Sequence, residues 1–285
     1  MRRYEGFDLT YYNGYQIESR CSIAYFPDSE ADLIDILSEN KSDDIVILGT
    51  GNNVILSKRY YREKFIILNG CFDRFDINGN EVVAEAGAKM LQLSQEALRN
   101  NLSGFEIFYD IPSSVGGAIV MNAGAAGEEI KDSLVKVRYL DLNDMSIKEI
   151  DKNKIDFQYR NSFFQKNKDK IVLKAWFKLA EDNHDKIKNK MNNMKIARLA
   201  KQPREFPNCG SVFKRPEGHY VGLMIDEIGL KGFTIGGAKI SEKHGGFIIN
   251  IGNATGDDII AIITETKKRV KERFGIDLEL EQRII

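Results

Sequence analysis

Apolar residues recur at helical spacing in several parts of the chain. The clearest case begins at Thr255, which stands three residues before Asp258, the spacing of an N-terminal capping box. Isoleucines and Val270 form the inner stripe behind this cap, and Gly275 ends the predicted helix. Apolar stripes also predict helices over residues 28–40, 90–100 and 220–228, and a charged helix is predicted over residues 185–201.

Short apolar or alternating runs bounded by turn residues predict strands. Residues 171–180 alternate between a lysine-bearing face and an apolar face, and turn residues at 78–80 and 143–144 indicate β-hairpins. The apolar run 119–121 predicts a buried strand, whereas residues 1–20 are polar and predicted to be irregular. Helices and strands mix without a regular βαβ rhythm, which predicts an α+β fold with several small sheets. Further strands are predicted over residues 22–25, 44–48, 54–56, 65–68, 81–85, 135–140, 146–150, 238–240, 247–250 and 278–285.

Composition narrows the class of protein. The chain has 285 residues, 42% hydrophobic and 29% charged, which is typical of a globular protein of two or three domains. Lys and Arg number 41 against 42 Asp and Glu, so no basic field indicates nucleic acid. No apolar run reaches the roughly 18 residues of a membrane span, and no signal peptide is recognisable. Cys21, Cys71 and Cys209 form neither a zinc motif nor a disulfide framework, so no metal is expected and a cytoplasmic location is predicted.

Two stretches rich in small residues give the first indication of a ligand. One covers residues 111–127 and includes the pair Gly116 and Gly117 together with Asn122; the other covers residues 49–53. Residues this small let the backbone approach a flat or bulky molecule, and loop amides can hold phosphates. The two stretches together favour a nucleotide cofactor. For either one alone, a tight crossing in the core or an ordinary turn is the alternative.

Gly49 and Gly51 follow a predicted strand, as in a Rossmann motif. The third glycine of that motif is missing, and Val54, Ile55 and Leu56 predict another strand in place of the helix that would hold a pyrophosphate. The Rossmann interpretation is therefore rejected. A different nucleotide-binding fold, in which loops between strands hold the phosphates, fits better.

Further motifs follow in an order that is similar to one known family. They are Gly49-Thr50-Gly51-Asn52-Asn53, residues 111–127, Tyr159-Arg160-Asn161-Ser162, residues 207–216, Gly229-Leu230-Lys231-Gly232, Gly236-Gly237-Ala238, Ser241-Glu242-Lys243-His244, Phe247-Ile248-Ile249-Asn250 and Glu281-Gln282-Arg283-Ile284-Ile285. In this order they resemble the UDP-N-acetylenolpyruvoylglucosamine reductases, also called UDP-N-acetylmuramate dehydrogenases or MurB. The resemblance covers about the whole chain from Gly49 onward.

The resemblance implies a fold, a domain division and a reaction. The fold is the vanillyl-alcohol-oxidase or PCMH type of FAD-binding fold with a C-terminal α+β substrate domain. Residues 1–70 and 71–183 are then two FAD-binding subdomains, and residues 184–285 the substrate-binding domain. NADPH is implied as electron donor and a UDP-sugar as substrate, in a monomeric enzyme of peptidoglycan precursor synthesis. The implied FAD-binding residues are Gly49, Thr50, Gly51, Asn52, Asn53, Ile111, Pro112, Ser113, Ser114, Gly116, Gly117, Asn122, Ala123, Gly124 and Gly127.

The resemblance also implies three catalytic residues. An enolpyruvyl group accepts hydride at its terminal carbon when the charge that develops on its carboxylate is stabilised. Arg160 matches the family's arginine for this carboxylate, and Glu281 matches an acid that donates a hydrogen bond as a neutral carboxyl. Ser211 matches the serine that gives a proton to the resulting enolate. Without the resemblance, a turn serine, a structural arginine and a solvent-facing acid are the alternatives.

Four further residues are candidates for binding the substrate. Lys214 and Arg215 follow Ser211 closely and could bind the diphosphate, with solvated surface charge as the alternative. His244 could touch the sugar or the flavin, although a histidine satisfied by local bonds is the commoner case. Tyr159 stands next to Arg160 and is a candidate for supporting it.

The sequence departs from the family pattern at several positions. Ser113 stands where the family has glycine, Asn52 replaces a serine, and Asp110 replaces a glycine. Gln282 takes the place of a valine directly after Glu281. The catalytic positions are kept. A paralogous FAD oxidoreductase acting on another nucleotide-sugar, and a non-catalytic member of the fold, are the alternative functions.

Overall fold

The computed structural model describes residues 1–40 and 44–285, in which the chain divides into two units. Unit 1 consists of Met1–Glu5, Ile23–Thr50 and Arg62–Ile196, and unit 2 of Gly6–Ser22, Gly51–Tyr61 and Ala197–Ile285. Each unit has a hydrophobic core of its own. The expected division at residues 70 and 183 into three parts stays a prediction. Every helix in the described part of the chain is too short or too polar to cross a bilayer.

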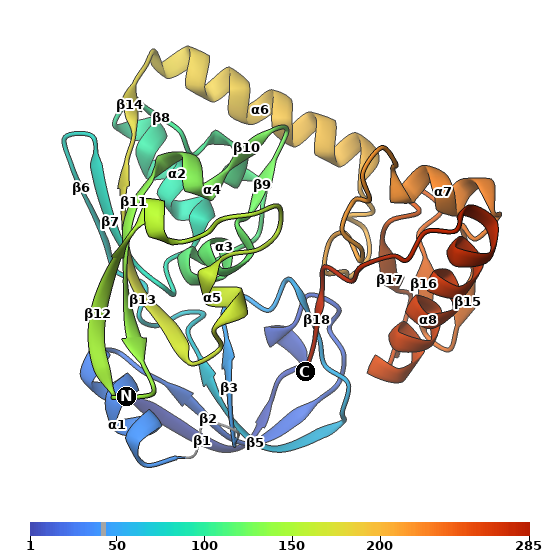
Figure 1. Ribbon diagram of the computed structural model, residues 1–285, viewed down its shortest axis with the longest axis horizontal. Coiled ribbons are helices and arrows are strands. Elements are labelled where there is room, and N and C mark those ends of the chain that lie inside the picture. The colour runs from blue at the N-terminus through green and yellow to red at the C-terminus, as the bar shows by residue number, and fades with distance from the viewer. Residues whose placement is uncertain (41–43) are drawn as a thin grey trace. The chain divides into compact units, whose positions relative to one another are not determined.

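Helices and strands alternate irregularly along the chain (Figure 1). The strands are β1 (Arg2–Asp8), β2 (Arg20–Phe26), β3 (Ile45–Leu48), β4 (Val54–Ile55), β5 (Tyr60–Ile67), β6 (Phe75–Asn78), β7 (Glu81–Glu85), β8 (Leu102–Ser103), β9 (Gly124–Ala125), β10 (Glu128–Glu129), β11 (Leu134–Asp141), β12 (Ser146–Asp151), β13 (Lys170–Lys178), β14 (Ala180–Glu181), β15 (Thr234–Ile235), β16 (Ala238–Ile240), β17 (Ile248–Asn250) and β18 (Arg283–Ile284). The helices are α1 (Glu30–Ser38), α2 (Met90–Arg99), α3 (Val115–Met121), α4 (Ile130–Ser133), α5 (Phe163–Lys166), α6 (His184–Lys201), α7 (Val221–Glu227) and α8 (Gly256–Phe274), with 3₁₀-helices η1 (Thr10–Tyr12), η3 (Glu106–Tyr109) and η4 (Lys152–Lys154).

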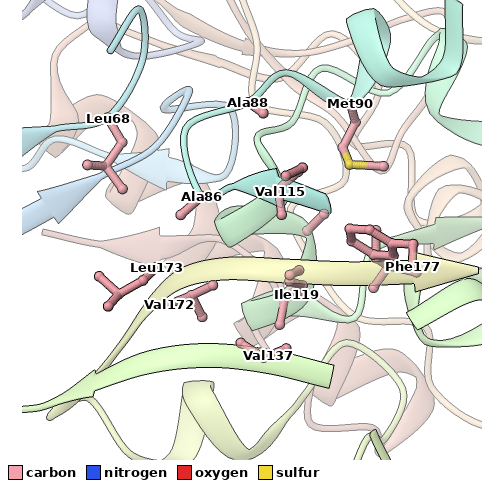
Figure 2. Packing of buried hydrophobic residues seen from close by; sticks show 14 of the residues in the cluster. Leu68, Ala86, Ala88, Met90, Val115, Ile119, Val137, Val172, Leu173 and Phe177 are labelled. Carbon is pink, nitrogen blue, oxygen red and sulfur yellow. The ribbon is translucent and has the colours of Figure 1, made fainter. Parts of the chain in front are cut away.

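An antiparallel five-stranded sheet in the order β12-β11-β13-β7-β6 forms the centre of unit 1. Its two predicted hairpins are confirmed, because β6 pairs with β7 and β11 with β12 across the expected turns. Helix α3 packs on β13, and Figure 2 shows Val115 and Ile119 of this helix among Val137, Val172 and Phe177 of the sheet. This core fixes the start of α3, which carries the second small-residue stretch.

Residues 119–121 were expected to form a strand, and this prediction is wrong. They complete helix α3, which begins after Ser114 with a hydrogen bond of 2.8 Å from the N–H of Ala118 to the carbonyl of Ser114. A run of three apolar residues has no period of its own, so it does not distinguish a buried strand from a buried helical turn.

The prediction that residues 1–20 are irregular is also wrong. Arg2–Asp8 forms strand β1, and Thr10–Tyr12 forms a 3₁₀-turn. Nearly all side chains of β1 are exposed, so the strand lacks the apolar alternation on which the sequence argument relied.

Unit 2 combines a three-stranded antiparallel sheet, β15-β16-β17, with helices α7 and α8 (Figure 1). The capping box of α8 is present as predicted, with Thr255 and Asp258 exchanging side-chain to backbone bonds. Gly275 ends the helix with φ of 71°. The predicted last strand is shorter than expected, since Arg283–Ile284 forms a strand in parallel with β4 and Leu280 makes only an isolated bridge with Phe213.

Candidate functional site

Gly49 directly follows β3 and lies against Ser114, the residue that caps α3. A Cβ atom at Gly49 would stand 2.6 Å from Oγ of Ser114, so only glycine permits this approach. The hydroxyl oxygen of Ser114 accepts a hydrogen bond of 3.3 Å from the N–H of Gly117. Gly49 of the first small-residue stretch and Ser114 of the second therefore meet within unit 1.

The first backbone N–H groups of α3 are engaged by the protein itself. Val115 donates to the carbonyl of Ala88 and Gly116 to the carbonyl of Ala86, both at 2.9 Å. A Cβ at Gly116 would come within 3.1 Å of the Cβ of Ala86. Gly116 therefore serves close packing of the helix, and the expectation of exposed amides in this run does not hold for these two N–H groups.

Asn122 supplies a buried acceptor at the other end of α3. It caps the helix with φ of 44°, and its Nδ2 donates to Oε2 of Glu129 at 2.9 Å and to the carbonyl of Gln158 at 3.0 Å. Its Oδ1 has no hydrogen-bond partner among the residues the structure describes, and the residue is fully buried. An unpaired buried acceptor is costly, so the group fits a ligand that brings a donor.

Arg160 is bound to the same stretch. Its backbone has φ of 52° in a tight turn between Gln158 and Asn161. Nη2 donates to the carbonyl of Gly124 at 2.7 Å and Nη1 to the carbonyl of Asn122 at 3.3 Å. The guanidinium also lies 5.2 Å from the ring centre of Tyr159, whose side chain is exposed. The position of this arginine therefore depends on the fold of the small-residue run.

The other predicted cofactor residues of this run have structural roles or open surroundings. The carbonyl of Ser113 accepts from the N–H of Met90 at 3.0 Å, and the N–H of Ala123 donates to Ala118 at 2.8 Å. Gly127 has φ of 90°, and a Cβ there would meet nothing within 4 Å. Ile111 and Pro112 precede Ser113 and follow the 3₁₀-helix η3.

Residues Gly51, Asn52 and Asn53 belong to unit 2, whereas Gly49 and Thr50 belong to unit 1. Gly51 has φ of 71°, and a Cβ there would lie 2.0 Å from the carbonyl oxygen of Tyr12, so this close backbone contact requires glycine.

Ser211 and Glu281 lie on adjoining backbone segments of unit 2. The N–H of Glu281 donates to the carbonyl of Val212 at 2.9 Å. The carbonyl of Glu281 accepts from Nδ2 of Asn53 at 3.2 Å, which also ties the first small-residue stretch to this segment. Ser211 forms a β-bridge with Phe247 and is exposed. The backbone segments that carry Ser211 and Glu281 come from distant parts of the sequence and are thus hydrogen-bonded neighbours in unit 2.

The candidate substrate residues of unit 2 all have local partners. Nζ of Lys214 pairs with Glu279 at 2.5 Å, and the guanidinium of Arg215 lies 4.7 Å from the ring centre of Tyr220. Burial lowers the pKa of His244, and two lysines nearby act in the same direction. His244 is therefore a neutral imidazole around pH 7.

Sequence reasoning missed one residue of this region. Gln282 is buried next to Glu281, and its side chain bonds to Tyr15 and to the backbone at Ser211. The only sequence signal was its departure from the valine of the family pattern.

Comparison with known proteins identifies the family. A family profile described as "UDP-N-acetylenolpyruvoylglucosamine reductase, C-terminal domain" matches residues 202–285, and one described as "FAD binding domain" matches residues 22–150. A UDP-N-acetylenolpyruvoylglucosamine reductase of Francisella tularensis subsp. tularensis is 42% identical over 283 residues, covering 99% of each chain. The chain belongs to this reductase family.

Other members of the MurB family agree in sequence and structure. The reductase of Caldanaerobacter subterraneus subsp. tengcongensis is 41% identical over 276 residues, covering 96% of this chain and 90% of the relative. The crystal structure of the MurB enzyme from Thermus caldophilus matches with a TM-score of 0.84 and 31% identity, over 99% of this chain and 98% of that one.

Family membership confirms the predicted family and the fold class, an FAD-binding domain of the PCMH type with a MurB C-terminal domain. The chain is accordingly an FAD-dependent oxidoreductase of peptidoglycan precursor synthesis. Both small-residue stretches lie inside the FAD-binding match, and Ser211 and Glu281 lie inside the C-terminal match.

Proposed function

We propose that this chain reduces UDP-N-acetylenolpyruvoylglucosamine to UDP-N-acetylmuramate with NADPH. The observation that carries the proposal is the full-length similarity to a reductase of that name. The proposal assigns the catalytic roles to Arg160, Ser211 and Glu281. When bound, FAD accepts electrons from NADPH and supplies a hydride to the terminal carbon of the enolpyruvyl group.

The two small-residue stretches hold the cofactor in this proposal. Gly49 and Ser114 meet at the start of α3, and the unpaired Oδ1 of buried Asn122 offers an acceptor to a flavin donor. The side-chain amide of Asn122 is held by the bonds that its Nδ2 donates to Glu129 and Gln158, so the acceptor is preorganised.

Arg160 binds the enolpyruvyl carboxylate. As hydride adds to the terminal carbon, the π-electron pair moves toward the carboxylate and negative charge develops there. A guanidinium held by two loop carbonyls keeps its orientation while that charge grows, which is the condition for preferential transition-state stabilisation. Glu281, as a neutral carboxyl group, donates a further hydrogen bond to the carboxylate of the substrate.

Ser211 completes the reduction by giving its hydroxyl proton to the carbon that carries the ether oxygen. The exposed position of Ser211 leaves the hydroxyl accessible to substrate, and solvent restores the proton afterwards. Lys214 and Arg215 bind the diphosphate of the substrate. Lys214 must then exchange its ion pair with Glu279 for a phosphate oxygen, a small cost because Glu279 is exposed. Tyr159 supports Arg160, and His244 contacts the sugar.

The cytoplasmic location and the monomeric state stay predictions. The three free, buried cysteines are compatible with a reducing compartment.

Anaerobic half-reactions test the proposal. NADPH is added to the FAD-loaded protein until the flavin absorbance is bleached, and UDP-N-acetylenolpyruvoylglucosamine is then mixed in. We expect the flavin absorbance to return with formation of UDP-N-acetylmuramate. The variant Ser211→Ala should still be bleached by NADPH but recover at least about 100-fold more slowly. A wild-type protein that stays bleached with this sugar, yet recovers with another nucleotide-sugar, would favour the paralogue.

A further inference from the structure

The side chain of Gln282 lies at the centre of a buried hydrogen-bond network in unit 2. Its Oε1 accepts a bond of 2.9 Å from the hydroxyl of Tyr15. Its Nε2 lies 3.1 Å from the carbonyl oxygen of Cys209, 3.2 Å from that of Gly210 and 3.4 Å from that of Ser211. Tyr15 is fully buried and Gln282 is 3% exposed, so water does not compete for these bonds.

The chemistry of the partners fixes the orientation of the Gln282 amide. The carbonyl oxygens of Cys209, Gly210 and Ser211 only accept hydrogen bonds, so the amide nitrogen must face them. The amide oxygen then faces Tyr15, which must donate. Burial raises the pKa of Tyr15 well above its usual value, which keeps its hydroxyl protonated as the network requires. Every polar atom of the Gln282 side chain is thus satisfied in one orientation.

The network also connects the two groups that the proposed function uses in unit 2. Ser211 is part of the 209–211 turn, the three residues whose carbonyls face Gln282, and Gly210 has φ of 76° in this turn. Glu281 directly precedes Gln282 and donates its N–H to Val212, the residue after Ser211. The side chain of Gln282 therefore connects the segment that contains Glu281 with the turn that contains Ser211.

We infer that Gln282 is a positioning residue that, together with Tyr15, holds the 209–211 turn, and with it Ser211, in a fixed conformation next to the backbone segment of Glu281. This inference rests on the proposed function, in which Ser211 supplies the proton.

Two substitutions separate positioning from general stability. Gln282→Met keeps the length of the side chain and removes its bonds, whereas Tyr15→Phe removes only the hydroxyl that orients the amide. Thr255→Ala is the matched control, since it removes the capping bond of α8 in the same unit without touching the 209–211 turn. Each variant is loaded with FAD and assayed in the two anaerobic half-reactions.

A displaced turn should slow only the proton-dependent half-reaction. We expect reoxidation by the enolpyruvyl sugar to fall about 100-fold in Gln282→Met and less in Tyr15→Phe, with NADPH reduction within about twofold of wild type. Thr255→Ala should lower thermal stability and leave both half-reactions unchanged. If Gln282→Met is too unstable to purify, Tyr15→Phe tests the inference by the same comparison, namely slower reoxidation by the sugar with unchanged reduction by NADPH.

Alkylation of Cys209 gives a readout that does not depend on catalysis. Its thiol is buried in the 209–211 turn, so loosening the turn should raise its rate of reaction with iodoacetamide, while Cys21 and Cys71 stay unreactive. The inference would be overturned if Gln282→Met and Tyr15→Phe both showed the wild-type rate of reoxidation and the wild-type rate of Cys209 alkylation. If Ser211→Ala itself recovers at the wild-type rate, the proposed proton donor is wrong, whatever the Gln282 variants show.

Discussion

Nη2 of Arg160 donates a 2.7 Å hydrogen bond to the carbonyl of Gly124, and Nη1 donates to the carbonyl of Asn122. The guanidinium is therefore fixed to the loop that follows α3, inside the region matched by the FAD-binding profile. Arg160 itself lies beyond that match, in a turn with a left-handed backbone. Its orientation is consequently set by the stretch predicted to hold the cofactor.

Arg160→Lys should separate charge from orientation. Lysine keeps the positive charge but lacks the planar fork that reaches two carbonyls at once. We expect reoxidation of the flavin by the sugar to slow by about 10²- to 10³-fold, with NADPH reduction little changed. Stopped-flow absorbance of both half-reactions measures this. Arg138→Lys is the control, because Arg138 makes a forked pair with Glu30 elsewhere in unit 1 and should leave both rates intact.

Asn122 carries both a left-handed backbone and a buried amide, and two substitutions separate these contributions. Asn122→Gly keeps the backbone conformation and should cost about 1–2 kcal/mol for the lost amide bonds. Asn122→Ala should cost about 1 kcal/mol more, because a Cβ opposes φ of 44°. Urea unfolding of the FAD-free proteins measures the difference. Equal stabilities would show that the backbone is not strained at this position.

Both variants should also purify with less flavin per protein, since each loses the acceptor Oδ1 of Asn122. Full retention of FAD by Asn122→Gly would contradict the assignment of that acceptor to the cofactor.

Local sequence rules predicted the elements whose signals are local. The capping box of Thr255 and the terminating Gly275 gave α8, and the turn at 78–80 gave the β6–β7 hairpin. Residues 119–121 were assigned to the wrong element because the decision between strand and helix came from Ser114 and the packing of α3 on β13. Propensity carries no information about that packing.

For the candidate site too, sequence rules identified residues but not the distant residues that they contact. Arg160, Ser211 and Glu281 could be named as candidates from motif order, because residue types at fixed places identify the family. The partners that hold them could not be named. The bond between Tyr15 and Gln282 joins residues 267 positions apart, and no spacing rule connects them. Likewise, the N–H of Gly116 donates to the carbonyl of Ala86, a bond that no spacing rule predicts.

Gly275 offers a clean measurement of backbone strain. It has φ of 71°, and a Cβ there would meet nothing within 4 Å, so substitution changes conformational preference without a clash. Gly275→Ala should lower the free energy of unfolding by about 1 kcal/mol. Gly275→Asn should cost less, since asparagine tolerates this conformation. Urea titrations at constant pH compare the three proteins, and equal losses for both variants would show that side-chain type does not matter here.

The three cysteines should be unreactive in the folded enzyme. Burial raises the pKa of Cys21 to about 11 and that of Cys71 and Cys209 to about 12. At pH 8 about one thiol in a thousand or fewer is then a thiolate, and none is accessible. Ellman's reagent should release no colour within minutes from native protein, and titrate all three thiols in urea. Fast labelling of native protein would contradict the burial of at least one thiol.

His244 should make the free energy of unfolding fall as the pH drops below about 6.5. Burial lowers the pKa of His244, so the unfolded state, with an ordinary pKa of about 6.5, binds its proton at a higher pH than the folded state. The stabilisation is therefore fully present above about pH 6.5 and is lost as the pH falls through the lower folded-state pKa. His244→Asn keeps an acceptor for the N–H of Gly246, which bonds Nδ1 at 3.1 Å, but cannot titrate. Urea unfolding at a series of pH values should show a steeper decline for wild type than for the variant. If the free energy of unfolding changed with pH equally in wild type and in His244→Asn, the pH dependence would belong to other groups.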